Sequence, residues 1–297
     1  MGVLSRYKNG NLITTLYSDG TRVRETQDDE FVPEFSENVD VHISDRCDNK
    51  CSMCYANCTP DGKFGDLEAH WLNTVHAGTE MAVNLNFPMH PDFLKFAKRM
   101  RHKGIVLNAT VNQKHFEENE SFIKFLMDYE LIYGLGISLV KPTKDFVNRV
   151  KKYPNAVIHV INGIFSKEDY DILKDNNLKV LILGYKDKGR GVSYHSNNED
   201  TVSVKQKWLY QNLEDVLKGF CVASFDNLGL EQLEVKRLIP DEEWETLYSG
   251  DDGTFTFFIN TVEGYFAKNS VSNVHYPIGD RSIDEMFDVV RTGVVSV

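Results

Sequence analysis

Hydrophobic and polar residues alternate in short segments between Val39 and Arg190. Six segments have the period of two that is typical of strands, at 39–44, 81–87, 105–112, 134–140, 156–162 and 179–185. Five segments between them have the apolar spacing of helices, at 66–78, 91–103, 119–130, 143–152 and 166–176. Strands that alternate with helices in this way predict repeated βα units around a parallel sheet.

One face of these predicted strands is polar. The polar positions are His42, Asn84, Asn86, Asn108, Thr110, Asn112, Ser138 and His159. Strands of a doubly wound sheet are covered on both faces and are nearly continuously apolar, and the interior of a complete eight-stranded barrel is mostly branched aliphatic. The pattern therefore favours an incomplete barrel whose chamber holds a polar ligand, although single amides of this set can instead cap neighbouring loops.

The segments outside this repeat are shorter and less regular. Turn signals at 8–11 and 18–20 predict an N-terminal β-hairpin. After Arg190 we expect a polar linker at 194–200, a helix at 203–218 and a loop that contains Cys221. A hairpin over 255–268 and a last helix over 282–291 follow, the latter with Ser282 as N-cap and Glu285 three residues later. The predicted parts are an N-terminal extension at 1–38, a core at 39–192 and a C-terminal α+β extension at 193–297 that caps the barrel.

Composition and charge narrow the class of protein. The chain has 297 residues with 41% hydrophobic and 26% charged content, which is typical of soluble globular proteins. Its net charge of −11 disfavours binding to large nucleic acids. The sequence has no apolar run of membrane-spanning length and no signal-peptide pattern at its start, so we expect a cytoplasmic protein without a membrane partner.

Four of the five cysteines fall within twelve residues, directly after the first predicted strand of the repeat. In a reducing compartment such a cluster indicates metal binding, and thiolates select zinc, copper(I) or iron–sulfur clusters. If Cys58 joins Cys47, Cys51 and Cys54, the site is closed, as in a structural zinc site or a fully ligated cluster. If Cys58 does not join them, one iron of a cluster stays open. The location above a polar chamber favours the open site, and we expect Cys58 to be a bystander, while Cys221 stands alone in the C-terminal segment.

The spacing Cys47-x3-Cys51-x2-Cys54, after the first strand of a six-unit repeat, resembles the radical SAM superfamily, and further positions agree across 39–192. The resemblance implies an α/β fold with a partial (β/α)6 TIM-like barrel. It implies a 4Fe-4S cluster held by the three cysteines, with S-adenosylmethionine (SAM) on the fourth iron. It also implies reductive cleavage of SAM to a 5′-deoxyadenosyl radical, which abstracts hydrogen from an unidentified small molecule, nucleotide or peptide. The electron would come from an external donor such as flavodoxin or ferredoxin.

The same resemblance suggests which other residues contact SAM. Asn84-Leu85-Asn86 stands where the family has Gly-Gly-Glu, so Asn86 would accept a hydrogen bond from the methionine ammonium without supplying a negative charge. Further expected contacts are Asn108 on the polar face, Ser138 near the ribose, Ile161 and Met53 against adenine, and the loop at Gly184 and Tyr185. The alternative interpretation is a non-catalytic scaffold in which four cysteines, Cys58 included, close a zinc or iron–sulfur site.

Overall fold

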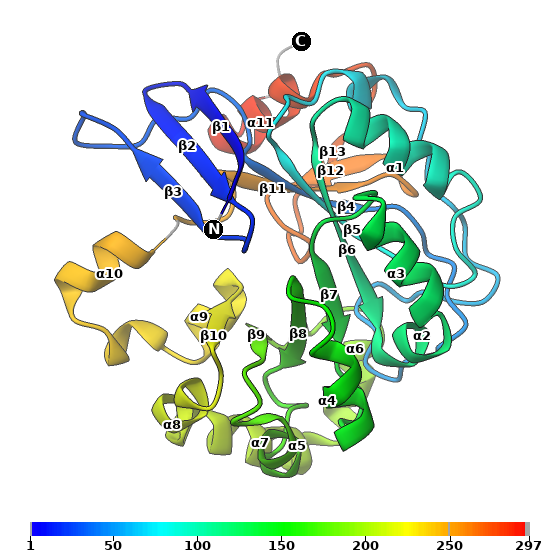
Figure 1. Ribbon diagram of the computed structural model, residues 1–297, viewed down its shortest axis with the longest axis vertical. Helices are drawn as coiled ribbons and strands as arrows, with labels where there is room; N and C mark the ends of the chain where they lie inside the picture. Colours follow the sequence, from blue (N-terminus) through cyan, green and yellow to red (C-terminus); the bar gives the residue numbers. More distant parts are fainter. Residues whose placement is uncertain (1, 249, 295–297) are drawn as a thin grey trace.

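The computed structural model describes residues 2–248 and 250–294, and its central element is a ten-stranded sheet (Figure 1). The strand order is β10-β9-β8-β7-β6-β5-β4-β11-β12-β13. The six predicted strands form its middle as β4 (Asn38–His42), β5 (Glu80–Asn84), β6 (Val106–Asn112), β7 (Leu135–Ser138), β8 (Ala156–Ile161) and β9 (Lys179–Leu183), and neighbouring strands in this group are parallel. The sheet curves but does not close, since β10 and β13 are its two separate edges.

Two further parallel strands extend the predicted six. β10 (Val222–Phe225) pairs with β9, and β11 (Thr256–Asn260) pairs with β4. The predicted C-terminal hairpin is present, because β11 turns at Gly264 into β12 (Tyr265–Ala267), which then pairs with the two-residue strand β13 (Tyr276–Pro277). The chain thus has an α/β fold with a large, open parallel sheet.

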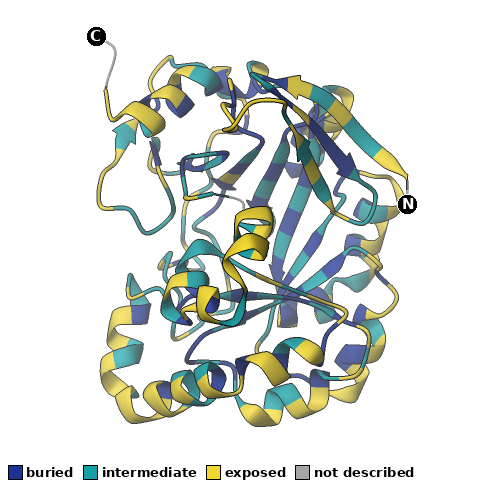
Figure 2. Cartoon of the chain, turned by 90° about the vertical axis from the view of Figure 1, so that its left-hand side faces the viewer, coloured by how far each residue is buried: buried dark blue, intermediate teal, exposed yellow. Residues whose placement is uncertain are grey.

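Helices cover the outer face of this sheet (Figures 1 and 2). Along the parallel strands they are α1 (Phe93–His102), α2 (Gln113–Glu118), α3 (Glu120–Asp128), α4 (Lys144–Val150), α5 (Lys167–Leu173), α6 (Arg190–Asn197), α7 (Glu199–Gln211) and α8 (Leu213–Lys218). After them in the chain come α9 (Asn227–Gln232), η2 (Val235–Leu238), α10 (Asp241–Leu247) and α11 (Ile283–Thr292), of which α9 and α10 lie at the open side of the sheet (Figure 1). Alternate strand residues such as Val39, Leu107 and Ile158 are at most 3% exposed and form the core beneath these helices.

Three local predictions were wrong. The segment 66–78 forms only the short 3-10 helix η1 (His70–Asn73), because its buried side chains, Leu67, Trp71 and Leu72, pack on the core from an irregular loop. The predicted linker at 194–200 belongs to α6 and α7, and the predicted helix over 203–218 is broken at Asn212 between α7 and α8. The polar composition of 194–200 is that of two solvent-facing helix ends.

The predicted N-terminal hairpin is a three-stranded antiparallel sheet of β1 (Val3–Asn9), β2 (Leu12–Tyr17) and β3 (Arg22–Glu25). It packs at the end of the large sheet where the parallel strands begin. Glu37, which is fully buried, accepts a hydrogen bond from Arg24 Nε at 2.8 Å, and Arg22 pairs with both Glu37 and Glu80. Charges from two sheets therefore neutralise each other and close this end.

The predicted N-cap of the last helix, Ser282, is confirmed. Ser282 accepts a hydrogen bond from the backbone N–H of Glu285, and the Glu285 carboxylate accepts one from the backbone N–H of Ser282. This capping box sets the first residue of α11.

Candidate functional site

The cysteine-bearing loop, residues 43–66, follows β4 at the end of the large sheet opposite the N-terminal sheet. Its two halves are held together by backbone hydrogen bonds, since Cys47 N donates to Thr59 O at 2.8 Å and Asp45 N donates to Lys63 O at 2.9 Å. Cys47, Cys51 and Cys54 are half-buried free thiols. The loop thus presents its three predicted ligands from a fixed backbone.

Arg190, the first residue of α6, connects this loop to the segment that follows β9. Its Nε donates to Cys51 O at 2.9 Å, one of its terminal nitrogens donates to Cys58 O at 3.0 Å, and its backbone N–H donates to Cys54 O at 3.1 Å. Gly189 precedes it with φ of 56°, and a Cβ there would lie 2.3 Å from Tyr55 O. Sequence reasoning included Arg190 in the loop after the sixth strand but missed this role.

Two residues of the β6–α2 region also contact the loop. The Nδ2 of Asn112 donates toward Cys51 Sγ at 3.7 Å. The buried His115 contacts Asp48 Oδ1 at 2.6 Å and Asn49 Nδ2 at 3.0 Å. The hydrogen bond from His115 lowers the pKa of Asp48. These contacts were not predicted, although Asn112 was placed correctly on the polar face.

The thiols differ in their electrostatic environment. Burial raises the pKa of Cys47 and of Cys51. A hydrogen bond from the Cys58 thiol lowers the pKa of Cys54 to about 6, and the same contact raises the pKa of Cys58. Cys54 is therefore the thiol that is most readily present as a thiolate, the form that ligates metals.

The donor set fits a thiolate-ligated cluster better than a single closed ion. Sulfur ligands of one tetrahedral zinc lie about 3.8 Å apart, given a Zn–S bond of about 2.3 Å. Among residues 2–248 and 250–294, the only group of three or more His, Cys, Asp or Glu donors within 4.8 Å of one another is His42, Asp45 and Cys58. The four cysteines therefore do not converge as a closed zinc site, whereas three half-buried thiols with an amide donor at one sulfur suit a larger cluster.

Asn84 and Asn86, at the end of β5, lie beneath the loop. Asn84 accepts a hydrogen bond from Ile43 N at 2.8 Å and donates to Ser44 O at 2.8 Å. Asn86 donates to Ser44 O at 3.0 Å and toward Cys58 Sγ at 3.8 Å. Within the described part of the chain, no hydrogen-bond donor reaches the side-chain oxygen of Asn86. That oxygen is oriented by the anchored amide nitrogen and can accept a hydrogen bond from a ligand.

Polar side chains line the inner face of the sheet as predicted. Asp40 is reached by solvent, yet burial among protein atoms raises the pKa of its carboxyl, and the carboxylates of Asp252 and Asp226 add to this. Burial lowers the pKa of His159 to about 4, so its imidazole is neutral at pH 7. Asp40 and His159 thus lie on the face that lines the predicted chamber, where protein atoms surround side chains that solvent still reaches. Gly136 makes room there, since a Cβ would lie 2.4 Å from His159 Cε1 and 2.8 Å from Thr110 Oγ1.

The remaining predicted contacts lie at different places around this chamber. Ser138 and Ile161 are the last residues of β7 and β8, and Met53 is half-buried in the cysteine loop, so all three lie toward the loop end. The backbone N–H and carbonyl of Tyr185 both hydrogen-bond to Gln232, at 2.8 and 2.9 Å.

Two of the predicted contacts are engaged elsewhere in the fold. Gly184 N donates to Asp226 Oδ1 at 2.8 Å. Asn108 lies near the start of β6, at the end away from the loop, where it donates to Glu80 and accepts from Gly134 N. The structure therefore does not bring Asn108 to the cysteine loop.

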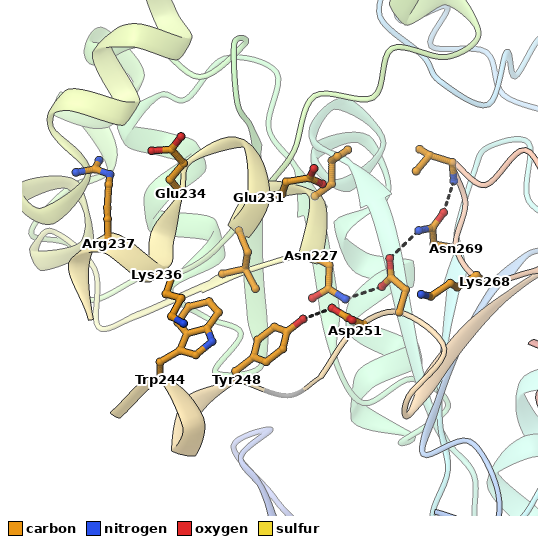
Figure 3. Close-up of a pocket in the computed structure, with 14 residues that line it drawn as sticks. Asn227, Glu231, Glu234, Lys236, Arg237, Trp244, Tyr248, Asp251, Lys268 and Asn269 are labelled. Atoms are coloured by element: carbon orange, nitrogen blue, oxygen red, sulfur yellow. Dashed lines mark hydrogen bonds between the residues drawn. The ribbon is translucent and has the colours of Figure 1, made fainter. Parts of the chain in front are cut away.

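A cavity of about 730 Å³ lies where the sheet is open (Figure 3). Its walls come from the α9–α10 segment on one side, including Asn227 and Trp244, and from Asp252 and Lys268 beside the β11–β12 hairpin on the other. Asn227 Nδ2 donates to Asp252 across it at 2.8 Å. Asp252 lies four residues before β11, which pairs with β4, the strand that carries Asp40.

No family model and no curated protein matches the sequence. Among solved structures, the fold is similar to that of Streptococcus suis SuiB bound to S-adenosylmethionine, with a TM-score of 0.53 and 12% identity. The chain shares its fold with SuiB. The similarity covers 89% of this chain and 69% of SuiB.

Within residues 2–248 and 250–294, no helix is both long enough and apolar enough to span a membrane.

Proposed function

We propose that this chain is a radical SAM enzyme, in which Cys47, Cys51 and Cys54 hold a 4Fe-4S cluster and SAM binds at the open iron. The observation that carries the proposal is the position of these three thiols, on a hydrogen-bonded loop that follows the C-terminal end of β4. The similarity in fold to a protein solved with bound SAM supports it. When bound, the cluster and SAM supply a 5′-deoxyadenosyl radical that removes a hydrogen atom from the substrate.

The chain's own residues would position the ligands. The side-chain oxygen of Asn86 would accept a hydrogen bond from the methionine ammonium, held in place by the contact from its amide to Ser44 O. An amide in place of a carboxylate gives a weaker contact, because it lacks the negative charge. Ser138, Ile161 and Met53 surround the same end and would contact the nucleoside part. Tyr185 would add van der Waals contacts only, because its N–H and carbonyl are both engaged, and Gly184, whose N–H is engaged, could offer only its carbonyl.

The substrate would occupy the chamber and enter through the opening between β10 and the β11–β12 hairpin. The neutral His159 and the carboxyl of Asp40 face this space and offer hydrogen bonds to a polar substrate. We propose a small molecule, nucleotide or peptide, since the net charge of −11 repels large nucleic acids. Reducing electrons would come from a flavodoxin or ferredoxin, and we expect a cytoplasmic location.

The decisive experiment is anaerobic reconstitution with iron and sulfide, followed by dithionite and SAM. We expect 5′-deoxyadenosine from the wild-type chain and none from C47S, C51S or C54S, which lack a cluster ligand. C221S, which changes an exposed cysteine far from the loop, is the matched control and should behave as wild type. A fully loaded cluster that yields no 5′-deoxyadenosine would refute the proposal.

A further inference from the structure

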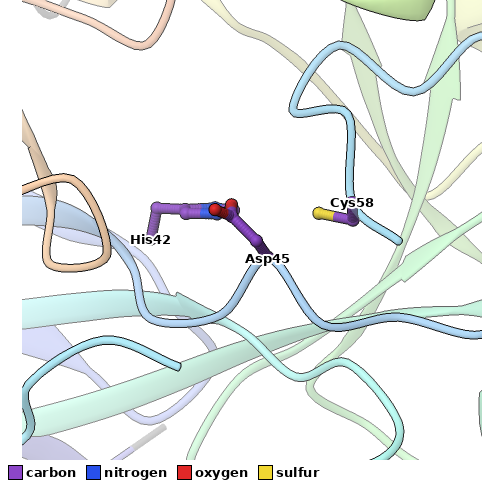
Figure 4. A group of neighbouring side chains, drawn as sticks. All are labelled: His42, Asp45 and Cys58. Carbon is purple, nitrogen blue, oxygen red and sulfur yellow. The ribbon is translucent and has the colours of Figure 1, made fainter. Parts of the chain in front are cut away.

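His42, at the end of β4, forms with Asp45 and Cys58 of the cysteine loop a compact group of three different metal-ligand types (Figure 4). Their donor atoms lie within 4.8 Å of one another, and His42 Nε2 is 2.6 Å from Asp45 Oδ1. The Cys58 sulfur points toward the His–Asp pair (Figure 4). His42 is 6% exposed and Cys58 is 8% exposed. The group is therefore a nearly preformed nitrogen, oxygen and sulfur site.

We infer that His42, Asp45 and Cys58 bind a zinc ion that is separate from the site of Cys47, Cys51 and Cys54. Zinc takes thiolate, imidazole and carboxylate ligands in one tetrahedral shell, and three protein ligands leave the fourth position to water. The zinc site does not depend on the proposed enzymatic function, because none of its ligands is assigned to the cluster or to SAM.

The geometry needs only small adjustments to accept the ion. In a tetrahedral shell the nitrogen and oxygen ligands lie about 3.3 Å apart, given zinc bonds of about 2.0 Å, so the 2.6 Å contact between His42 and Asp45 must open by less than an ångström. The Asp45 side chain is 29% exposed and has room to rotate. Cys58 loses its thiol proton on binding, as metal-bound thiols do.

The backbone around the three residues is already fixed. The His42 carbonyl accepts hydrogen bonds from Thr261 N at 3.0 Å and Thr261 Oγ1 at 2.9 Å, which ties the end of β4 to the segment after β11. Thr59, next to Cys58, donates its N–H to Asp45 O at 2.9 Å. Asp45 and Cys58 are thus held face to face before any ion arrives, so binding has little ordering entropy to overcome.

The position of this site suggests what it does. Asp45 precedes Cys47 by two residues and Cys58 follows Cys54 by four, so a zinc ion on Asp45 and Cys58 closes the segment that carries all three proposed cluster ligands. Cross-linking the two ends of a loop restricts its open conformations. The ion would therefore keep the cluster ligands in place when the cluster is absent.

Zinc binding is tested first in the full-length C47S/C51S/C54S variant, which cannot ligate the cluster. We expect about one zinc per chain by metal analysis, and a thiolate-to-cobalt charge-transfer band when cobalt(II) replaces zinc. When C58S is added to this variant, the band should disappear. Each of C58S, H42A and D45N, added singly, should weaken zinc binding by at least about tenfold. C221S and D61N, which change an exposed cysteine and an exposed aspartate of the same loop, are the matched controls and should change nothing.

The wild-type protein provides a second, independent measurement. After anaerobic reconstitution with iron and sulfide, we expect about one zinc in addition to the cluster iron, with one sulfur and two or three nitrogen or oxygen neighbours by X-ray absorption at the zinc edge. Three or four sulfur neighbours would place zinc on the other cysteines and overturn the inference. So would the absence of zinc from the triple variant, or a cobalt band that survives C58S. Formation of 5′-deoxyadenosine is scored separately, so the two proposals can fail independently.

Discussion

Arg190 offers a quantitative test of how the cysteine loop is held. Replacing Arg190 with Met removes two hydrogen bonds from a charged donor, to Cys51 O and to Cys58 O. Each such bond contributes about 1.5–3 kcal/mol, and the lower part of that range applies because the arginine is only half-buried. We therefore expect the free energy of loop opening to fall by about 3–4 kcal/mol, which is a hundredfold or more in the opening equilibrium at about 1.4 kcal/mol per tenfold.

Hydrogen exchange measured by mass spectrometry on the anaerobic, metal-free protein reports this opening directly. The amides of Cys47, Cys54 and Asn57 donate to loop carbonyls and should exchange faster in R190M by the factor above. R190K should lie about midway, because one ammonium cannot span both carbonyls as a guanidinium does.

R281M is the matched control for this experiment. The guanidinium of Arg281, like that of Arg190, donates to the backbone, but to one carbonyl only, Pro277 O at 2.9 Å, in a different part of the fold. Its loss should leave exchange in 47–58 unchanged. Equal exchange of the loop amides in R190M and in the wild type would show that the arginine contacts do not hold the loop.

Three further changes test other parts of the fold. E37Q removes a fully buried carboxylate, leaves Arg24 without its partner and leaves Arg22 with Glu80 alone, and it should lower the free energy of unfolding in urea by about 3–5 kcal/mol, whereas E25Q, at an exposed ion pair, should cost less than about 1 kcal/mol. G136A should cost about 1–3 kcal/mol by overpacking the chamber, and unchanged stability would show that the chamber can expand. Because the folded-state pKa of His159 is about 4 and the unfolded value is about 6.5, its contribution to stability is complete above pH 6.5 and is lost as the pH falls toward 4. The loss should amount to about 1–3 kcal/mol, and H159N should make the unfolding curves less dependent on pH in that window.

The strand pattern of the core was predictable from sequence because each strand buries one face. Val39 and Val41 alternate with Asp40 and His42, and the structure buries the aliphatic residues against helices while the polar ones face inward. The same rule missed β10, whose four residues are exposed or half-buried at a sheet edge. An edge strand of this kind lacks the buried face that makes a strand recognisable.

The candidate site was predictable only where chemistry is local in sequence. Cys47, Cys51 and Cys54 were identified from their spacing, and the structure places them on one loop. Arg190 and His115 contact that loop from residues far along the chain, and nothing in their own neighbourhoods marks those contacts. Asn108 shows the converse, since the strand pattern places it on the inner face but does not say at which end of the strand it acts.

The polar groups at the two ends of the parallel strands differ in their hydrogen-bond partners. At the end where the strands begin, Glu80 is bonded to Arg22 and Asn108, and Lys179 donates to Asp19 O of the N-terminal sheet, so polar groups of the chain satisfy one another. At the opposite end Asn86 uses its amide nitrogen on the loop backbone, and no donor among the described residues reaches its side-chain oxygen. Buried polar groups require partners, and at the first end other groups of the chain supply them. Asn86 is only half-buried, so its oxygen can be hydrated, and it is available to a ligand without an unpaired polar group in the folded chain.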